Sequence, residues 1–93
     1  FSPVHVGALA LRNRIVMAPL TRQRADADHV PTDIMAEYYA QRASAGLIVA
    51  EATMVMAGNS AFGGREPGIY SSAQVAAWRR VTDAVHARGG LIV

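Results

Sequence analysis

The chain has 93 residues, of which 52% are hydrophobic and 17% charged, and its formal net charge at pH 7 is +2. This composition is typical of a globular unit that forms a core, and it excludes an intrinsically disordered segment. The chain holds no cysteine, which excludes disulfides and thiolate metal sites within it.

The charge pattern and the apolar runs bear on the kind of partner. All nine basic residues are arginines, and they form no basic stripe with interleaved aromatic residues, so we expect no nucleic-acid partner. No apolar run approaches the roughly 20 residues that a membrane-spanning helix needs. The three histidines show no metal-ligand spacing, so we expect no metal site. These features favour a cytoplasmic protein without a membrane partner.

The chain begins with a predicted β-hairpin. Two short extended runs, residues 4–6 and 9–11, flank a turn at Gly7-Ala8. A first core strand follows at residues 15–18.

This first core strand is apolar without alternation, which is typical of a strand covered on both faces in a parallel sheet. Pro19 ends it, because proline has no N–H to donate to a central ladder. Leu20 and Thr21 therefore come just beyond the strand's C-terminal end, which is where parallel α/β folds bind ligands.

A helix is predicted over residues 33–45. Thr32 is a plausible N-cap, and Asp33 places negative charge in the first turn, where it favours the helix dipole. Gly46 is a good residue for the position after the helix.

A second strand, residues 47–52, repeats the design of the first, with an apolar run followed by Glu51-Ala52-Thr53. The segment 54–70 is rich in glycine and reads as a loop, whose length favours a functional role. A third apolar strand opens at residues 91–93. Because both ends look cut, we expect the chain to be a piece of a longer protein.

A second helix is predicted over residues 71–88. Ser71 with Gln74 matches a capping box. Apolar or small side chains recur on one face at helical spacing. These are Val75, Trp78, Val81, Thr82 and Val85.

The order β-α-β-α-β after a hairpin implies parallel strands with right-handed crossovers. A Rossmann unit would need a glycine-rich turn between strand and helix, but residues 21–30 contain no glycine, and no Walker A motif is present. The remaining common fold is the start of a (β/α)8 barrel, which holds ligands at the C-terminal ends of its strands.

Motifs along the whole chain, in order, resemble the N-terminal part of the Old Yellow Enzyme family. The nearest resemblance is to its bacterial branch of N-ethylmaleimide and pentaerythritol tetranitrate reductase-like ene-reductases. The motifs are Leu11-Arg12-Asn13-Arg14-Ile15, Met17-Ala18-Pro19-Leu20-Thr21-Arg22, Tyr38-Tyr39-Ala40-Gln41-Arg42-Ala43-Ser44-Ala45-Gly46, Glu51-Ala52-Thr53 and Pro67-Gly68-Ile69-Tyr70-Ser71 with Trp78-Arg79. The resemblance implies that residues 1–93 are the hairpin and first βαβαβ part of a single FMN-binding (β/α)8 barrel domain.

The resemblance also implies a cofactor site at the strand ends. Ala18, Pro19 and Leu20 match the family's flavin-contacting backbone. Thr21 matches a threonine whose hydroxyl donates toward flavin O4, and Ala52 matches a small residue beside the ring. From residue type alone, the threonine would as readily cap a turn, and the alanine would as readily fill a tight barrel layer.

Two further residues have open roles. Phe62 falls where this branch often has a tyrosine lining the substrate cavity, and the alternative is an aromatic that packs within its loop. Glu51 is a carboxyl group at a strand end, for which we favour a structural ion pair or hydrogen bond over a general-acid role. No catalytic residue of the family matches a position here, because its substrate-holding and proton-donating residues lie further along.

The implied activity is reduction of activated alkenes by an FMN-dependent, NADPH-using enzyme. Enones and maleimides are the expected substrates, with nitro compounds or nitrate esters as further candidates. Two alternatives remain open: a related FMN barrel such as a dienoyl-CoA reductase, and a truncated, non-catalytic barrel fragment. The residues do not indicate an oligomeric state.

Overall fold

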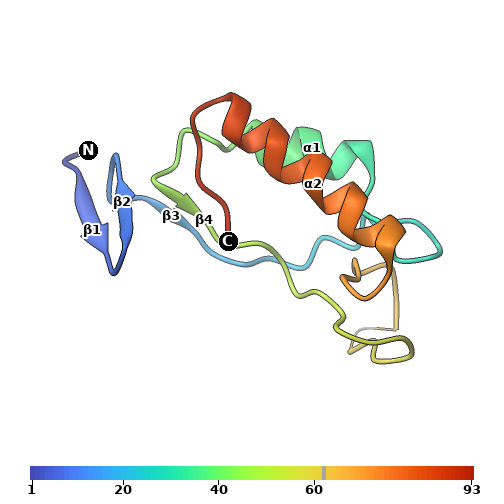
Figure 1. The fold of residues 1–93 in the computed structure, drawn as a ribbon. Coiled ribbons are helices and arrows are strands. Elements are labelled where there is room, and N and C mark those ends of the chain that lie inside the picture. The colour runs from blue at the N-terminus through green and yellow to red at the C-terminus, as the bar shows by residue number, and fades with distance from the viewer. Residues whose placement is uncertain (62) are drawn as a thin grey trace.

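The computed structural model describes residues 1–61 and 63–93. Its elements follow the predicted order: β1 (Val4–Val6), β2 (Leu9–Leu11), β3 (Val16–Met17), α1 (Asp33–Ala40), β4 (Leu47–Ile48) and α2 (Ser72–Ala87). The hairpin projects from one end, and the two helices lie beside each other across β3 and β4 (Figure 1). The described residues do not close a barrel.

The predicted hairpin is confirmed. β1 and β2 pair antiparallel, with Val6 opposite Leu9. Gly7 adopts a φ of +58°, the left-handed conformation that glycine allows in a two-residue turn.

The predicted parallel pair is also confirmed, and it is short. Val16 lies opposite Leu47 and Met17 opposite Ile48, and the ladder continues with a bond from Val49 N to Met17 O. It ends there because the next donor on the first strand would be Pro19, which has no N–H. The predicted third strand pairs parallel with β4 through a single bridge, between Ile48 and Ile92.

The core lies between the two helices and β4. Its buried residues include Met35, Tyr39, Ile48, Trp78, Val81 and Val85. The prediction that Val75 shares this buried face is wrong, because its side chain is 51% exposed. The first core strand is likewise not covered on both faces: Ile15 and Val16 are about half exposed, since β3 pairs only with β4 and the packed helices cover one side.

The predicted helix over 33–45 is shorter than expected. It ends at Ala40 with Gln41 as C-cap, and residues 42–45 continue as turns with bonds such as Ala43 N to Ala40 O. Gly46 is therefore not the residue that follows the helix. Thr32 occupies the N-cap position but does not cap, because its hydroxyl donates to Arg24 O at 2.7 Å.

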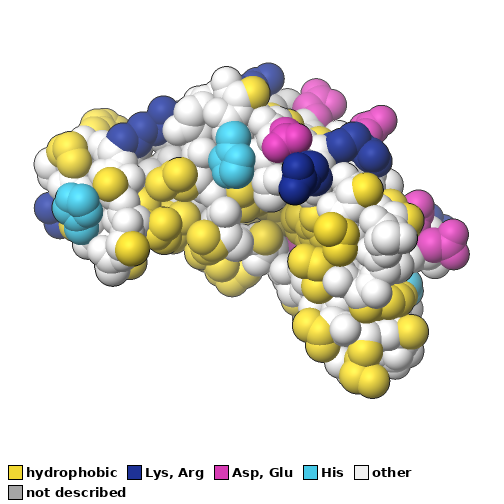
Figure 2. Space-filling model, viewed as in Figure 1, with side chains coloured by type: hydrophobic (Ala, Val, Ile, Leu, Met, Phe, Trp, Pro, Cys, Tyr) yellow, Lys and Arg dark blue, Asp and Glu magenta, His cyan; other side chains and the backbone are white. Residues whose placement is uncertain are grey.

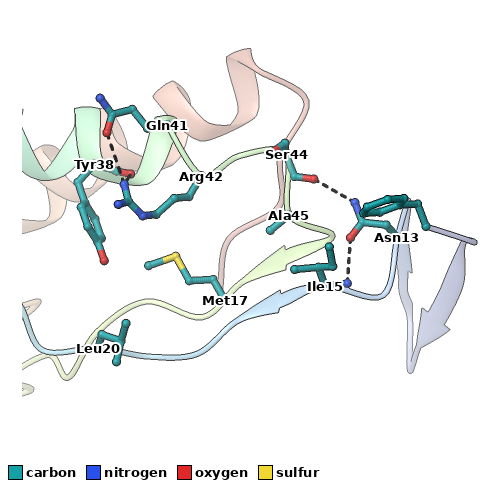
Figure 3. A pocket seen from close by; sticks show the side chains of 10 residues that line it. Asn13, Ile15, Met17, Leu20, Tyr38, Gln41, Arg42, Ser44 and Ala45 are labelled. Carbon is teal, nitrogen blue, oxygen red and sulfur yellow. Dashed lines mark hydrogen bonds between the residues drawn. The ribbon is translucent and has the colours of Figure 1, made fainter.

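Gly46 is required by a close backbone approach. A Cβ at this position would lie 2.2 Å from the backbone oxygen of Asn13. Asn13 is itself fixed, since its Nδ2 donates to Ser44 O at 3.0 Å and its Oδ1 accepts from Ile15 N at 2.9 Å (Figure 3). This clip joins the hairpin exit to the turn before β4.

The capping box of α2 is present as predicted. Ser71 Oγ accepts from Gln74 N at 3.2 Å, and Gln74 Oε1 accepts from Ser71 N at 3.1 Å.

We expect Ser71→Ala to lower the free energy of unfolding by about 1 kcal/mol, because one helix amide loses its acceptor. Thermal unfolding of the purified protein measures this loss. Ser72→Ala is the matched control, and an equal loss in both variants would contradict a capping role.

Candidate functional site

The predicted cofactor residues follow the C-terminal ends of the two parallel strands. The last paired residues are Met17 and Ile48, and Ala18–Thr21 and Ala52 come after them in the chain. Ala18, Pro19 and Leu20 are exposed, as is Ala52, and Thr21 is half-buried. These five residues thus follow the carboxyl ends of two neighbouring parallel strands.

The hydroxyl of Thr21 makes no hydrogen bond to any other described residue. A threonine that caps a turn would use its hydroxyl locally, as Thr53 does when its Oγ1 donates to Glu51 O at 2.9 Å. The turn-capping alternative for Thr21 therefore has no support in the described residues, and its hydroxyl is available to a ligand.

Near these strand ends, Glu51 and Tyr39 form a buried hydrogen-bonded pair. Glu51 Oε2 accepts from the Tyr39 hydroxyl at 2.6 Å, and Glu51 N donates back to the same hydroxyl oxygen at 3.1 Å. Both side chains are buried, with Tyr39 1% and Glu51 4% exposed. The structural role expected for Glu51 is thus a hydrogen bond, with Tyr39 as its partner.

Burial, together with the hydrogen bond to Glu51, raises the pKa of Tyr39 well above its usual value. The phenol therefore keeps its proton throughout the physiological pH range and stays a donor to the carboxyl group. Sequence reasoning missed this partner. The only signal was a tyrosine on the inward face of α1, which is equally typical of packing.

Glu51 also reaches the other strand end. Its Oε1 accepts from Arg22 N at 3.5 Å, a long contact that spans from one strand end to the other. The guanidinium of Arg22 lies 5.5 Å from the ring centroid of Tyr38, and that of Arg42 lies 3.9 Å from it. Arg42 lies in the turns after α1 and supports the end of that helix, since its Nη1 also donates to Tyr38 O.

The long segment 54–70 is held against the first loop by a set of bonds between residues 23–29 and 65–68, which we call the loop clasp. Ala25 N donates to Arg65 O at 3.1 Å, and Gly68 N donates to His29 O at 2.8 Å. Trp78 Nε1 donates to Gly68 O at 3.0 Å and fixes the clasp to α2. The sequence predicted a functional role for this loop from its length, but not the hydrogen bonds that fix it.

Several hollows flank the strands. One of about 480 Å³ is lined by Ala50, Trp78 and Val93 among others. Another, of about 510 Å³, runs between α1 and β3 and is lined by Ile15, Met17 and Tyr38 among others (Figure 3). It follows the side of the strand, where helices cover a (β/α)8 barrel. Of the predicted site residues that the structure describes, only Leu20 lines it. A smaller hollow of about 220 Å³ lies beside Ala52 at the strand ends. Apolar side chains are exposed on the side of the strands away from the helices (Figure 2).

The sequence model of the NADH:flavin oxidoreductase / NADH oxidase family matches residues 1–93. The chain belongs to this family. The resemblance to Old Yellow Enzyme is confirmed by solved structures of this family's members. An Old Yellow Enzyme homologue of Zymomonas mobilis is 60% identical, with a TM-score of 0.93 over 99% of this chain and 26% of its own. Morphinone reductase, solved with tetrahydroNAD, is 48% identical, with a TM-score of 0.94 over 100% of this chain and 25% of its own.

The curated relatives of this family carry related names. A chanoclavine-I aldehyde reductase of Penicillium roqueforti is 54% identical over 99% of this chain and 25% of its own length. A probable flavin mononucleotide-dependent alkene reductase of Leishmania infantum is 54% identical over 97% of this chain and 24% of its own length. The chain thus spans about a quarter of these relatives, and the predicted fold, the start of a TIM barrel, is confirmed.

The residues present fit a flavin of this family. Ala18, Pro19 and Ala52 are small and exposed, so a flat ring could approach the backbone there, and the Thr21 hydroxyl has no partner among the described residues. The predicted substrate residue Phe62 lies outside the described residues. No helix among the described residues is both long and apolar enough to cross a membrane.

Proposed function

We propose that this chain is the N-terminal part of a single FMN-binding (β/α)8 domain in an NAD(P)H-dependent ene-reductase. The substrates would be activated alkenes such as enones and maleimides, with nitro compounds or nitrate esters as further candidates, and NADPH is the proposed reductant. The names of the Leishmania relative and of an NADP-dependent oxidoreductase of Aspergillus flavus support this assignment. A cytoplasmic location remains a prediction.

The observation that carries the proposal is the half-buried Thr21, which follows the C-terminal end of β3 and whose hydroxyl has no hydrogen-bond partner among the described residues. When bound, FMN would accept reducing equivalents from NADPH and pass a hydride to the alkene. This chain's part is to hold the ring: Ala18 and Pro19 lend their backbone, and Thr21 donates a hydrogen bond toward O4. We assign Phe62 to the substrate side of the cavity and no catalytic group to these residues.

The test is to express the full-length protein and measure its flavin content, its oxidation of NADPH, and its reduction of 2-cyclohexenone and N-ethylmaleimide. We expect FMN to co-purify and NADPH oxidation to depend on the alkene. A full-length protein that folds but retains no FMN would overturn the proposal.

Replacing Thr21 by alanine in the full-length protein should slow flavin reduction more than it weakens FMN binding. Negative charge builds up along the O4 edge on reduction, so the hydrogen bond strengthens, from about 1 kcal/mol to a neutral acceptor toward roughly 1.5–3 kcal/mol to a charged one. A difference of about 1 kcal/mol lowers the two-electron potential by about 20 mV and slows reduction several-fold. Stopped-flow reduction by NADPH measures this, with Thr21→Ser as the control that keeps the hydroxyl. Equal rates in all three proteins would reduce Thr21 to a loop residue.

Two alternatives are distinguished by the same protein. A probable inactive reductase of Epichloe festucae is 42% identical over 99% of this chain, which supports considering a non-catalytic role. Flavin binding without alkene-dependent NADPH oxidation would favour that role. A dienoyl-CoA reductase would contain an iron–sulfur cluster, which gives its own absorption and iron content.

A further inference from the structure

We propose that Tyr39 is a positioning residue for the cofactor: through Glu51 it holds the two strand ends in register, so that the Thr21 hydroxyl is aimed at the flavin. This inference rests on the proposed function and names the group that fixes its key donor. Its experiment separates the two, because it begins from a full-length protein whose FMN binding and reduction have been measured.

The ladder between β3 and β4 ends early. Backbone pairing between β3 and β4 stops after the bond from Val49 N to Met17 O, because Pro19 has no N–H to continue it. The segment that carries Thr21 and the segment that carries Ala52 therefore lie past the last ladder bond. Something other than the ladder must fix their separation.

Beyond the ladder, hydrogen bonds of Glu51 connect the two strand ends. The amide of Glu51, on the segment of Ala52, donates to the Tyr39 hydroxyl oxygen at 3.1 Å instead of to a strand. The carboxyl group of Glu51 then accepts from the same hydroxyl at 2.6 Å and from Arg22 N at 3.5 Å. The side chains of Tyr39 and Glu51 thus connect α1 with the segments that follow β3 and β4.

These hydrogen bonds lie close in the chain to Thr21, the proposed hydrogen-bond donor. Arg22 directly follows Thr21, and Glu51 directly precedes Ala52. The hydrogen bond between Arg22 and Glu51 therefore joins residues that are each next to a predicted flavin contact. The Tyr39 ring also packs in the helix core near the Trp78 ring, with centroids 6.4 Å apart. A rigid core element is therefore coupled to the strand ends, which is the arrangement that keeps a functional group within a fraction of an ångström.

The experiment removes only the hydroxyl. In the full-length protein, Tyr39→Phe keeps the ring in the core, and Tyr38→Phe is the matched control, since among the described residues the Tyr38 hydroxyl has no hydrogen-bond partner. Three readouts are compared: the midpoint potential of the bound FMN, the rate of its reduction by NADPH, and the unfolding temperature of the apoprotein. We expect Tyr39→Phe to lower the potential and slow reduction several-fold, and Tyr38→Phe to match the wild type.

A double-variant cycle tests the route of the effect. If Tyr39 acts by aiming Thr21, then adding Tyr39→Phe to Thr21→Ala changes the potential and the rate little further. Additive losses would overturn the inference, and so would a Tyr39→Phe variant with a lower unfolding temperature but an unchanged potential and rate.

Substitutions of Glu51 give a second route in case Tyr39→Phe fails to fold. A glutamine can still bond at both positions, because its Nε2 can donate to the Tyr39 hydroxyl oxygen, so Glu51→Gln serves as the matched control. Glu51→Met, which is also nearly isosteric, has no carboxyl oxygen and loses both side-chain bonds, to Tyr39 and to Arg22. The same lowered potential is expected of Glu51→Met, and a wild-type potential in that variant would overturn the inference. A wild-type protein without bound FMN would instead defeat the proposed function itself.

Discussion

Gly46→Ala is expected to cost the protein about 3 kcal/mol of unfolding free energy, at the upper end of what overpacking a core site costs. The new Cβ would meet Asn13 O at 2.2 Å, Asn13 Oδ1 at 2.9 Å and Asn13 C at 3.0 Å. Two of these are backbone atoms, which cannot rotate away. Asn13 cannot retreat as a whole, because its side chain is bonded to Ser44 O and Ile15 N.

Thermal unfolding of the full-length protein measures this cost, together with the soluble yield. Ser44→Ala is the matched control, because among the described residues only the backbone oxygen of Ser44 is used in a bond, and its side chain is exposed. We expect the control to stay within about 0.5 kcal/mol of wild type. A Gly46→Ala protein as stable as this control would show that the turn before β4 shifts freely.

The 93-residue chain on its own is expected to bind FMN weakly or not at all. It supplies one strip of the proposed mouth, whereas barrels of this type bind phosphate with the loops after their seventh and eighth strands. Apolar side chains, Ile15, Val16 and Leu20 among them, are exposed. The described part of β3 also pairs on one side, with β4, and both features favour aggregation.

A titration of the purified chain with FMN, followed by flavin fluorescence, tests this expectation against the full-length protein as control. Circular dichroism of the same sample reports whether the helices have formed. Sub-micromolar affinity of the isolated chain would contradict the prediction and would mean that the strand-end motif suffices.

Local signals predicted the parts of the fold that depend on neighbouring residues. The Ser71 and Gln74 box lies within one helical turn, so the sequence contains both partners, and it formed as predicted. Thr32 has the right residue type and position, but a tertiary partner, Arg24 O, took its hydroxyl. The end of α1 was misplaced because Gly46, which looked like a helix stop, is required by the distant Asn13 instead.

The sequence indicated which residues follow the strand ends, but not the hydrogen bonds that hold them. Pro19 marks the end of β3 by its missing N–H, and this placed Thr21 at the strand end. The bond between Tyr39 and Glu51 links residues 12 apart whose contact depends on how α1 packs on β4. No periodicity encodes that contact, so only the folded structure reveals it.

The loop clasp bears on how this part of the molecule tolerates change over evolutionary time. Two of its bonds run between main-chain atoms, Ala25 N to Arg65 O and Gly68 N to His29 O. Two others use side chains of the first loop, because Arg65 N donates to Gln23 Oε1 and His29 Nδ1 is hydrogen-bonded to Glu66 O. Main-chain bonds survive most exchanges of side chain, provided that the backbone keeps its course. Exposed side chains of this segment that take no part in the clasp can therefore be exchanged with little loss of fold, whereas Gln23 and His29 are constrained by the bonds they make.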